Sequence, residues 1–212
     1  MEYTSDHSAP TTTFGLLRHG QTEWNVLKKI QGSGDSPLTA AGRKQTTQMV
    51  KTLKRYAWDR IIASDQGRVR ATVAILNGEL RLPVTFDPRL REQRWGDWEG
   101  LTIRYIQENH TNELARRVAM GWDFAAPNGE TRMAVKDRAL ATLLESAKRW
   151  PGKNILVVCH QGVVKSVLYS ITGREFLPGE DPLVQHNRLH LITCSEQIFS
   201  PLQLNIAGTQ AP

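Results

Sequence analysis

Residues 14–25 read Phe-Gly-Leu-Leu-Arg-His-Gly-Gln-Thr-Glu-Trp-Asn, and they place an Arg-His-Gly triplet where the short apolar stretch 14–17 ends. Such a stretch is typical of a buried strand, and in an open α/β sheet ligands bind outside the carboxyl ends of the strands. Gly20 lets the backbone approach a ligand closely, and Arg18 offers a planar set of donors that suits phosphate oxygens. This segment therefore predicts phosphoryl chemistry at one edge of a sheet.

Strand-like and helical segments alternate along the rest of the chain. Strands are predicted at residues 14–17, 61–63, 84–86, 154–159, 189–194 and 197–204, and helices at residues 40–56, 67–77, 131–150 and 162–171. This order predicts an α/β fold with a mostly parallel central sheet sandwiched by helices, and with antiparallel pairing at the edge formed by the last two strands. Residues 102–120 are also helical in pattern, and the segment 102–128 is expected to form a helical insert over the site.

The chain is long enough for one sizeable hydrophobic core, and no stretch of it has the composition of a linker. Of its 212 residues, 14–206 are predicted to form a single domain between two unstructured tails, at residues 1–13 and 207–212. The first tail lacks the basic start and apolar stretch of a signal peptide, and no apolar run approaches the length of a membrane span. No membrane partner is therefore expected.

Charge and cysteine content narrow the choice of partners and compartment. The formal net charge is +6, but the basic residues are dispersed over helix faces such as that of Lys51, Lys54 and Arg55. A solvated helix face explains them better than a nucleic-acid surface, so no nucleic-acid partner is expected. Cys159 and Cys194 make no disulfide framework and suit a reduced cytoplasm. An exposed edge strand near the C-terminus leaves a homodimer possible.

Further motifs follow the opening segment in a fixed order. They are residues 31–39 (Gln-Gly-Ser-Gly-Asp-Ser-Pro-Leu-Thr), 64–68 (Ser-Asp-Gln-Gly-Arg), 90–92 (Leu-Arg-Glu), 96–100 (Gly-Asp-Trp-Glu-Gly), and His160 at the end of the apolar strand 155–159. With the Arg-His-Gly segment they resemble the histidine phosphatase superfamily, also called the phosphoglycerate mutase-like family. The resemblance covers residues 14–193, which is nearly the whole chain.

The resemblance implies a phosphoryl-transfer site made of five residues. His19 is the implied nucleophile, whose neutral imidazole attacks phosphorus and holds the phosphoryl group as phosphohistidine. Arg18 and Arg68 neutralise the phosphoryl oxygens, to which His160 donates a hydrogen bond. Glu92 is the implied general acid, which protonates the leaving oxygen and then activates water as a base. An isolated histidine is more often structural, and it is the preceding arginine and the second histidine that favour a catalytic role for His19.

The implied substrate-binding residues are Arg18, Asn25, Gln31, Gly32, Arg68, His160 and Gln161. Asn25 has a turn-forming role as its alternative, and Glu99 competes with Glu92 on residue type alone but is expected to be structural. The chain departs from the family pattern in two places. Gln161 follows the second histidine where a small residue is usual, and Lys165 stands where an arginine is common. Both departures bear on the identity of the substrate.

The favoured function is that of a metal-independent phosphomonoesterase acting on a small phosphorylated metabolite. No metal or other cofactor is expected, because two arginines and two histidines supply the charge that magnesium gives elsewhere. The alternative is a phosphoglycerate mutase, which would need 2,3-bisphosphoglycerate and could bind a substrate carboxylate through Arg104, Arg116 or Arg117 of the insert. A non-catalytic binding module is the third interpretation. Specificity is expected to lie in residues 102–128, where no motif identifies the substrate.

Overall fold

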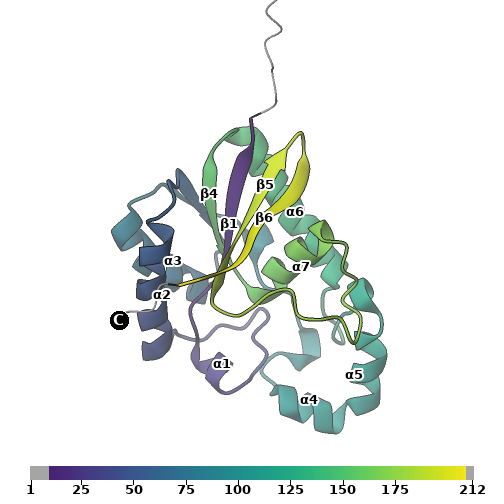
Figure 1. The fold of residues 1–212 in the computed structure, drawn as a ribbon. Coiled ribbons are helices and arrows are strands. Elements are labelled where there is room, and N and C mark those ends of the chain that lie inside the picture. Colours follow the sequence, from purple (N-terminus) through teal and green to yellow (C-terminus); the bar gives the residue numbers. More distant parts are fainter. Residues whose placement is uncertain (1–9, 209–212) are drawn as a thin grey trace, which may run out of the picture.

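The computed structural model describes residues 10–208, and the six-stranded sheet in this part of the chain has the order β3-β2-β4-β1-β5-β6 (Figure 1). The strands are β1 (Thr12–Arg18), β2 (Arg60–Ala63), β3 (Val84–Phe86), β4 (Asn154–Cys159), β5 (Arg188–Ser195) and β6 (Ile198–Ala207). The first four strands are parallel to one another, whereas β5 pairs antiparallel with β1 and β6 antiparallel with β5. The prediction of a mostly parallel sheet with an antiparallel edge is confirmed.

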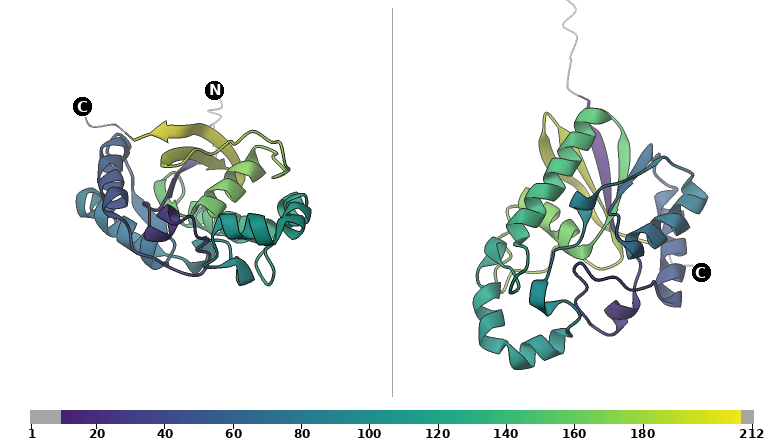
Figure 2. Two further views of the ribbon diagram at one scale, coloured as in Figure 1. Left: turned by 90° about the horizontal axis from the view of Figure 1, so that it is seen from below. Right: turned by 180° about the vertical axis from the view of Figure 1, so that it is seen from behind.

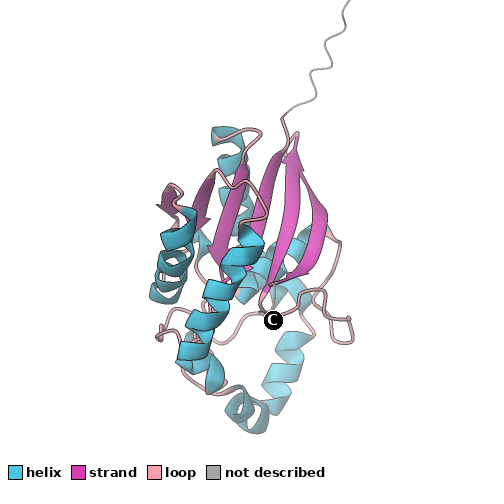
Figure 3. Cartoon of the chain, turned by 60° about the vertical axis from the view of Figure 1, so that its left-hand side comes forward, coloured by secondary structure: helices cyan, strands magenta, loops and turns pink. Residues whose placement is uncertain are grey.

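Helices cover both faces of this sheet (Figures 2 and 3). They are α1 (Glu23–Val26), α2 (Ala40–Leu53), α3 (Gly67–Leu80), α4 (Ile103–Asn109), α5 (Thr111–Val118), α6 (Arg132–Arg149) and α7 (Gln161–Ile171). Successive side chains of a strand point to opposite faces, so Phe14 and Leu16 of β1 pack in the core cluster of α6 and α7. Leu17 packs instead in the cluster of α2 and α3. The central strands β2, β4, β1 and β5 are therefore buried on both faces, which explains their apolar sequences.

Several element boundaries differ from the sequence-based expectation. The pair Asn77-Gly78 predicts a helix end, yet α3 continues to Leu80, and Arg81 closes it in the left-handed region with φ 54°. Asn77 still acts in this turn, because its side chain exchanges two hydrogen bonds with the backbone of Leu82. The long helical segment expected at residues 102–120 is two helices, which meet at His110.

The N-terminal tail was expected to span residues 1–13, but residues 12 and 13 already belong to the first strand. Strand β1 begins at Thr12, whose hydroxyl donates to the carbonyl of Trp150 and accepts from the amide of Gly152. At the other end of the chain β6 extends to Ala207, one residue into the second expected tail. Residues 1–9 and 209–212 of those tails lie outside the described residues.

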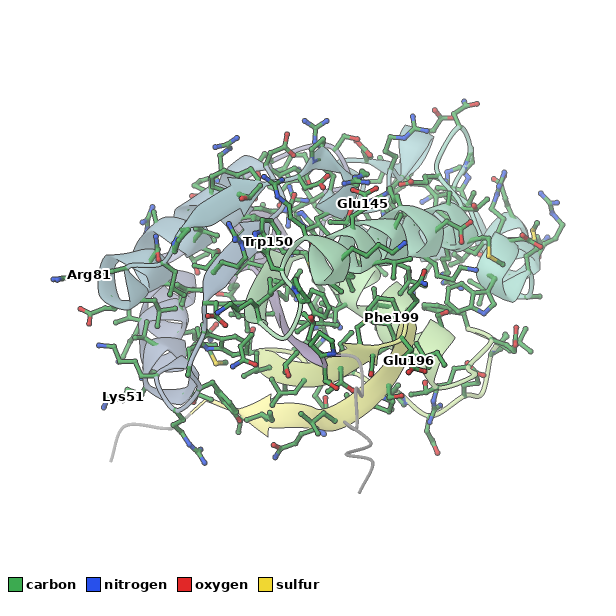
Figure 4. The ribbon with its side chains drawn as sticks, turned by 90° about the horizontal axis from the view of Figure 1, so that it is seen from above. Lys51, Arg81, Glu145, Trp150, Glu196 and Phe199 are labelled. Carbon is green, nitrogen blue, oxygen red and sulfur yellow. The ribbon has the colours of Figure 1, made fainter. Side chains whose placement is uncertain are left out.

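Three observations bear on the expectations about partners and compartment. Within residues 10–208, no helix is long and apolar enough to cross a membrane. Figure 4 shows Lys51 of α2 and Arg81 at the end of α3 pointing outward, and both are exposed, as expected for solvated helix faces. Cys159 and Cys194 are both free and buried.

The insert lies at the end of the sheet where the parallel strands terminate. Figure 1 shows α1, α4 and α5 beyond the carboxyl end of β1, whereas the chain enters β1 from the opposite end. Backbone bonding joins the insert to the loop after α1, because Ile30 donates to the carbonyl of Leu101 at 2.9 Å and Lys29 pairs with Thr102 in an isolated bridge. The ends of β1, β2 and β4 are thus enclosed by two segments far apart in the sequence.

Candidate active site

His19 follows directly after β1 and is nearly buried, with 3% of its surface exposed. Its amide donates to the carbonyl of Cys159 at 3.0 Å, which fixes it against the end of β4. Its Nδ1 lies 2.8 Å from the carbonyl oxygen of Gly20. A carbonyl only accepts, so Nδ1 carries the proton and Nε2 keeps its lone pair. Burial, followed by the charges of Arg18 and Arg68, lowers the pKa of His19 well below its usual value, so the ring is neutral at pH 7.

His160 lies between β4 and α7 and faces His19, with 5.2 Å between the ring centres and 62° between the ring planes. Its Nε2 is 2.9 Å from the hydroxyl oxygen of Ser64, which follows β2. When that hydroxyl donates to Nε2, the proton of His160 resides on Nδ1. Burial, and then the neighbouring His19 ring and the charges of Arg68 and Arg18, also lower the pKa of His160 well below its usual value. Three parallel strands therefore place two neutral imidazoles side by side.

The two predicted arginines differ in how they are held. Arg68 lies in the first turn of α3 and is 1% exposed, and its two terminal nitrogens donate to Gly32, Gly34, Asp35 and Gln66. The Nη1 of Arg18 lies 3.2 Å from the Nδ1 of His186. In both arginines Nε is buried and has no partner among the described residues. The guanidinium of Arg68 is thus held by four hydrogen bonds and that of Arg18 by one, and in each of them the buried Nε is left unused.

Unused donors are concentrated at this site. Among residues 10–208, seven buried side-chain nitrogen or oxygen atoms lack a hydrogen bond, and four of them belong to predicted site residues. These four are the Nε atoms of Arg18 and Arg68, Nδ1 of His160 and Nε2 of Gln161. A buried donor without an acceptor costs about 1–3 kcal/mol, so four donors favour a ligand with several acceptor oxygens. A phosphoryl group has this character and the charge to match.

Glu92 reaches the site from the segment after β3. Its Oε1 accepts from the amide of Gln93 at 3.0 Å and its Oε2 from the amide of Gly162 at 3.3 Å. Burial lowers the pKa of Arg18, and the negative charge of Glu92 opposes this shift, so the two side chains interact. A Cβ added at Gly162 would lie 2.3 Å from Oε1 of Glu92, so any larger residue here would displace the carboxylate. The start of α7 therefore positions the carboxylate through its backbone.

Three other predicted substrate-binding residues, Asn25, Gln31 and Gly32, are occupied by hydrogen bonds within the protein. Asn25 forms a capping box for α1, in which its Oδ1 accepts from the amide of Thr22 at 3.1 Å, as the turn-forming alternative expected. The amide of Gln31 is occupied at both ends, by Thr22 at 2.8 Å and by Ser36 at 3.3 Å, and so it holds the loop. Gly32 contributes its carbonyl to Arg68.

Glu99, expected to be structural, bonds only backbone amides. Its Oε1 accepts from Ser33 and from Trp95, both at 2.9 Å, and so joins the loop after α1 to the turn after Glu92. A Cβ on Gly32, which has φ +50°, would lie 2.1 Å from the same oxygen. The glycine is therefore required by both its backbone angle and the close approach of Glu99.

Sequence reasoning missed several residues around the site. Ser64 and Asp35 stand inside the quoted motifs, but nothing in the sequence assigns them to His160 and Arg68. His186 comes from the long segment before β5 and gave no signal. Lys165 was noted only as a departure, yet the charges of Arg132, Glu92 and Arg18 all affect its pKa, which burial lowers.

The comparisons with known proteins agree with this geometry. The family model described as "Histidine phosphatase superfamily (branch 1)" matches residues 14–206. The chain belongs to the histidine phosphatase superfamily. Among curated relatives, this histidine phosphatase is 30% identical to "Uncharacterized phosphatase PhoE" of Bacillus subtilis, over 84% of this chain and 83% of that protein. It is 36% identical to "Probable phosphoglycerate mutase GpmB" of Shigella dysenteriae, over 85% of this chain and 80% of that protein.

The fold is similarly shared. The solved structure of Bacillus stearothermophilus YhfR matches with a TM-score of 0.84 at 30% identity, covering 92% of this chain and 98% of that one. The histidine phosphatase described here is therefore an enzyme of the phosphatase and phosphoglycerate mutase-like type, with the α/β fold that its motifs predicted.

Proposed function

We propose that this enzyme is a metal-independent phosphomonoesterase that hydrolyses a small phosphorylated metabolite through a phosphohistidine on His19. The observation that carries the proposal is the set of four unused buried donors on Arg18, Arg68, His160 and Gln161 around a neutral imidazole. These donors suit three phosphoryl oxygens, where charge resides in the transition state. The buried free thiols and the small substrate fit a cytoplasmic enzyme.

The reaction has two steps. In the first, Nε2 of His19 forms a bond to phosphorus while the bond from phosphorus to the leaving oxygen breaks, and Glu92 gives that oxygen its proton. In the second, Glu92 takes a proton from water, the water oxygen bonds to phosphorus, and the P–N bond to His19 breaks. The proton of His19 stays on Nδ1 throughout, because Nδ1 donates it in a hydrogen bond to the carbonyl oxygen of Gly20, and this contact fixes the tautomer.

The mutase alternative is less well supported by the insert. Arg104 donates to Glu108, and Arg117 donates to Glu113 and to the carbonyl of Ala125, so both of these candidates for a substrate carboxylate are already paired. The GpmB relative carries the name of a probable mutase, and the test must therefore include that reaction.

The test compares wild type with His19→Ala in EDTA. We expect wild type to release phosphate from phosphomonoesters, and the variant to lose about 10⁴-fold or more in kcat/KM. Labelled substrate should leave an alkali-stable, acid-labile phosphate on wild type only. His190→Asn, which changes a buried histidine on β5, is the matched control. Activity that requires added metal, or conversion of 3-phosphoglycerate primed by 2,3-bisphosphoglycerate without free phosphate, would contradict the proposal.

A further inference from the structure

Gln66 directly precedes α3, and its side-chain amide contacts three segments of the candidate site. Its Nε2 donates to the carbonyl of Gly32 at 2.9 Å. Its Oε1 accepts from Nη2 of Arg68 at 3.2 Å and from the backbone amide of Glu92 at 3.0 Å. Because a carbonyl only accepts and an N–H group only donates, these contacts fix the orientation of the amide. One side chain thus joins the loop after α1, a phosphoryl-binding arginine and the proposed general acid.

Helix capping does not explain these contacts. Gln66 occupies the N-cap position of α3, yet its side chain makes no capping hydrogen bond. The carboxylate of Asp35 serves that purpose instead, since both of its oxygens lie 3.2 Å from the amide nitrogen of Arg68. Short polar side chains such as aspartate are the usual caps of a helix N-terminus. The amide of Gln66 therefore serves other segments than its own helix.

On the arginine side, Gln66 completes the set of acceptors around Arg68. Nη1 of Arg68 donates to the carbonyl of Gly34 at 2.7 Å and to Asp35 at 3.1 Å, and Nη2 donates to the carbonyl of Gly32 at 3.0 Å and to Gln66. A guanidinium has five N–H donors, four of them on the terminal nitrogens. With those four in use, the buried Nε is left for a ligand. The direction of this last donor depends on the four acceptors, one of which is Gln66.

On the acid side, Gln66 holds the backbone of Glu92. The carbonyl of Glu92 accepts from Nη2 of Arg138 on α6 at 3.2 Å, and its carboxylate accepts from the amide of Gly162 on α7 at 3.3 Å. These two contacts fix Glu92 against the helices on one side. The hydrogen bond to Gln66 is the contact that joins Glu92 to the arginine on the other side.

A second link joins the same two segments at the surface. Arg91 forms an ion pair with Asp65, but the Arg91 side chain is 55% exposed. Exposed ion pairs contribute little to stability because water and salt screen them. The amide of Gln66 is therefore the better placed of the two links to set the separation of Arg68 and Glu92.

We propose that Gln66 is a positioning residue for phosphoryl transfer. Through one oxygen it holds Arg68 and Glu92 at a fixed separation, so that the arginine binds the phosphoryl oxygens while the acid reaches the leaving oxygen of the same ester. The inference rests on the proposed function, because that function assigns these roles to Arg68 and Glu92. Loss of the oxygen should therefore impair both phosphoryl binding and proton donation.

The first test is Gln66→Met, which keeps the length of the side chain and removes its polar atoms. A displacement of about 1 Å can cost up to about 10²-fold, so kcat on ethyl phosphate should fall about tenfold to 10²-fold. On p-nitrophenyl phosphate, whose leaving group needs no proton, the loss should be at least about fivefold smaller. A merely structural role would lower both rates by the same factor. Gln48→Met, the same replacement on α2 outside the candidate site, should change neither rate.

Gln66→Glu tests whether the oxygen atom is the decisive group. Glutamate keeps an acceptor for Arg68 and Glu92 but cannot donate to Gly32. The ratio of kcat on the two esters should therefore stay within about twofold of wild type, whereas KM should rise about three- to tenfold for both, because the added negative charge repels an anionic substrate. A ratio changed as much as in Gln66→Met would overturn the proposal. If Gln66→Met does not fold, Gln66→Ala takes its place.

A binding measurement separates this inference from the proposed function. Calorimetry with inorganic vanadate, which resembles a phosphoryl group, should give about tenfold weaker binding to Gln66→Met than to wild type. If wild type hydrolyses neither ester, the proposed function falls; weaker vanadate binding in the variant then upholds the role of Gln66, and equal binding overturns it. If wild type releases phosphate and Gln66→Met slows both esters by the same factor, the role of Gln66 falls and the proposed function stands.

Discussion

The proposed phosphoryl site and the insert cavity, an apolar pocket lined by Ile30, Trp95, Trp98, Leu114, Val118 and Phe124, are built by different means. His19, Ser64 and His160 each follow a parallel strand, so the register of β1, β2 and β4 brings them together. The pocket instead lies between a loop and two short helices, and packing of its side chains defines it. Groups that must be held in fixed geometry extend from the sheet, whereas the groups expected to choose the substrate extend from a segment that can vary without disturbing the sheet.

Burial has opposite consequences in the two regions. In the phosphoryl site it keeps both imidazoles neutral, by lowering the pKa of His19 and of His160. In the insert cavity it provides apolar surface, and the donors of Trp98 and Arg132 occur singly. We therefore expect changes in the first region to affect all substrates alike, and changes in the second to affect the choice among them.

Glu92→Gln is expected to give the largest effect in this comparison, and it tests whether Glu92 is the general acid. Without a proton to donate, the variant should lose about 10²- to 10⁴-fold in kcat on ethyl phosphate, whose alkoxide leaves poorly. On p-nitrophenyl phosphate, whose leaving group needs no proton, the loss should be less than about tenfold. Steady-state kinetics on both esters measures the difference.

Glu99→Gln is the matched control for that measurement. Glu99 bonds only the backbone amides of Ser33 and Trp95, so its replacement should change both esters by the same factor. An equal loss on the two esters in Glu92→Gln would remove the general-acid role from Glu92.

The sequence predicts that Arg18, His19 and His160 come together, because strand ends leave little choice. Apolar strands ending in Arg18-His19 and in His160 are visible in the sequence, and parallel strands bring their carboxyl ends to one edge. The hydrogen bond from Nδ1 of His19 to Gly20, and the contact of His160 with Ser64, could not be predicted, since both depend on side-chain rotamers. Gln31 illustrates the limit: its place in a motif implied substrate binding, whereas its amide is bonded within the loop.

The insert cavity could not be predicted at all. Its walls come from the loop at Ile30, the turn at Trp95 and the helices of residues 103–118, and no periodic pattern records how such segments meet. Arg132 begins α6 and is indistinguishable by sequence from the many basic residues on helix faces. Only its position between the rings of Phe124 and Phe176, with no carboxylate partner among residues 10–208, distinguishes it.

Gly162→Ala tests whether the backbone at the start of α7 positions the Glu92 carboxylate. Its new Cβ would displace the Glu92 carboxylate, whose Oε1 lies 2.3 Å from that position. A displacement of about 1 Å can cost up to about 10²-fold, so we expect kcat on ethyl phosphate to fall about tenfold to 10²-fold. As in Glu92→Gln, p-nitrophenyl phosphate should be affected less. Equal rates in Gly162→Ala and wild type would show that the contact does not position the acid.

Gly78→Ala is the control substitution for Gly162→Ala. Gly78 is exposed within α3, and its added Cβ would meet nothing within 4 Å. Alanine there should leave both activities unchanged and raise the free energy of unfolding by about 0.4–1 kcal/mol, because it restricts the unfolded chain. Urea denaturation measures this change.

The smallest effect expected is on the pH dependence of stability, to which buried histidines in and outside the site contribute. His190 of β5 is 1% exposed, its Nδ1 accepts from the amide of Asn205 at 3.2 Å, and burial lowers its pKa to about 4. In the unfolded chain a histidine has a pKa of about 6.5, so the unfolded state binds more protons below that pH. The free energy of unfolding must therefore fall as the pH falls from 7.5 to 5.5.

His190→Asn keeps an acceptor for the amide of Asn205 but cannot be protonated. Between pH 7.5 and 5.5 the loss of stability should be smaller in this variant than in wild type by about 1 kcal/mol, as measured by urea denaturation at each pH. An unchanged loss would mean that His190 is not neutral in the folded protein. The loss that persists in His190→Asn contains the contribution of His19 and His160, and His19→Ala should reduce it further. Stability at low pH thus measures how strongly the fold holds its proposed nucleophile in the neutral form.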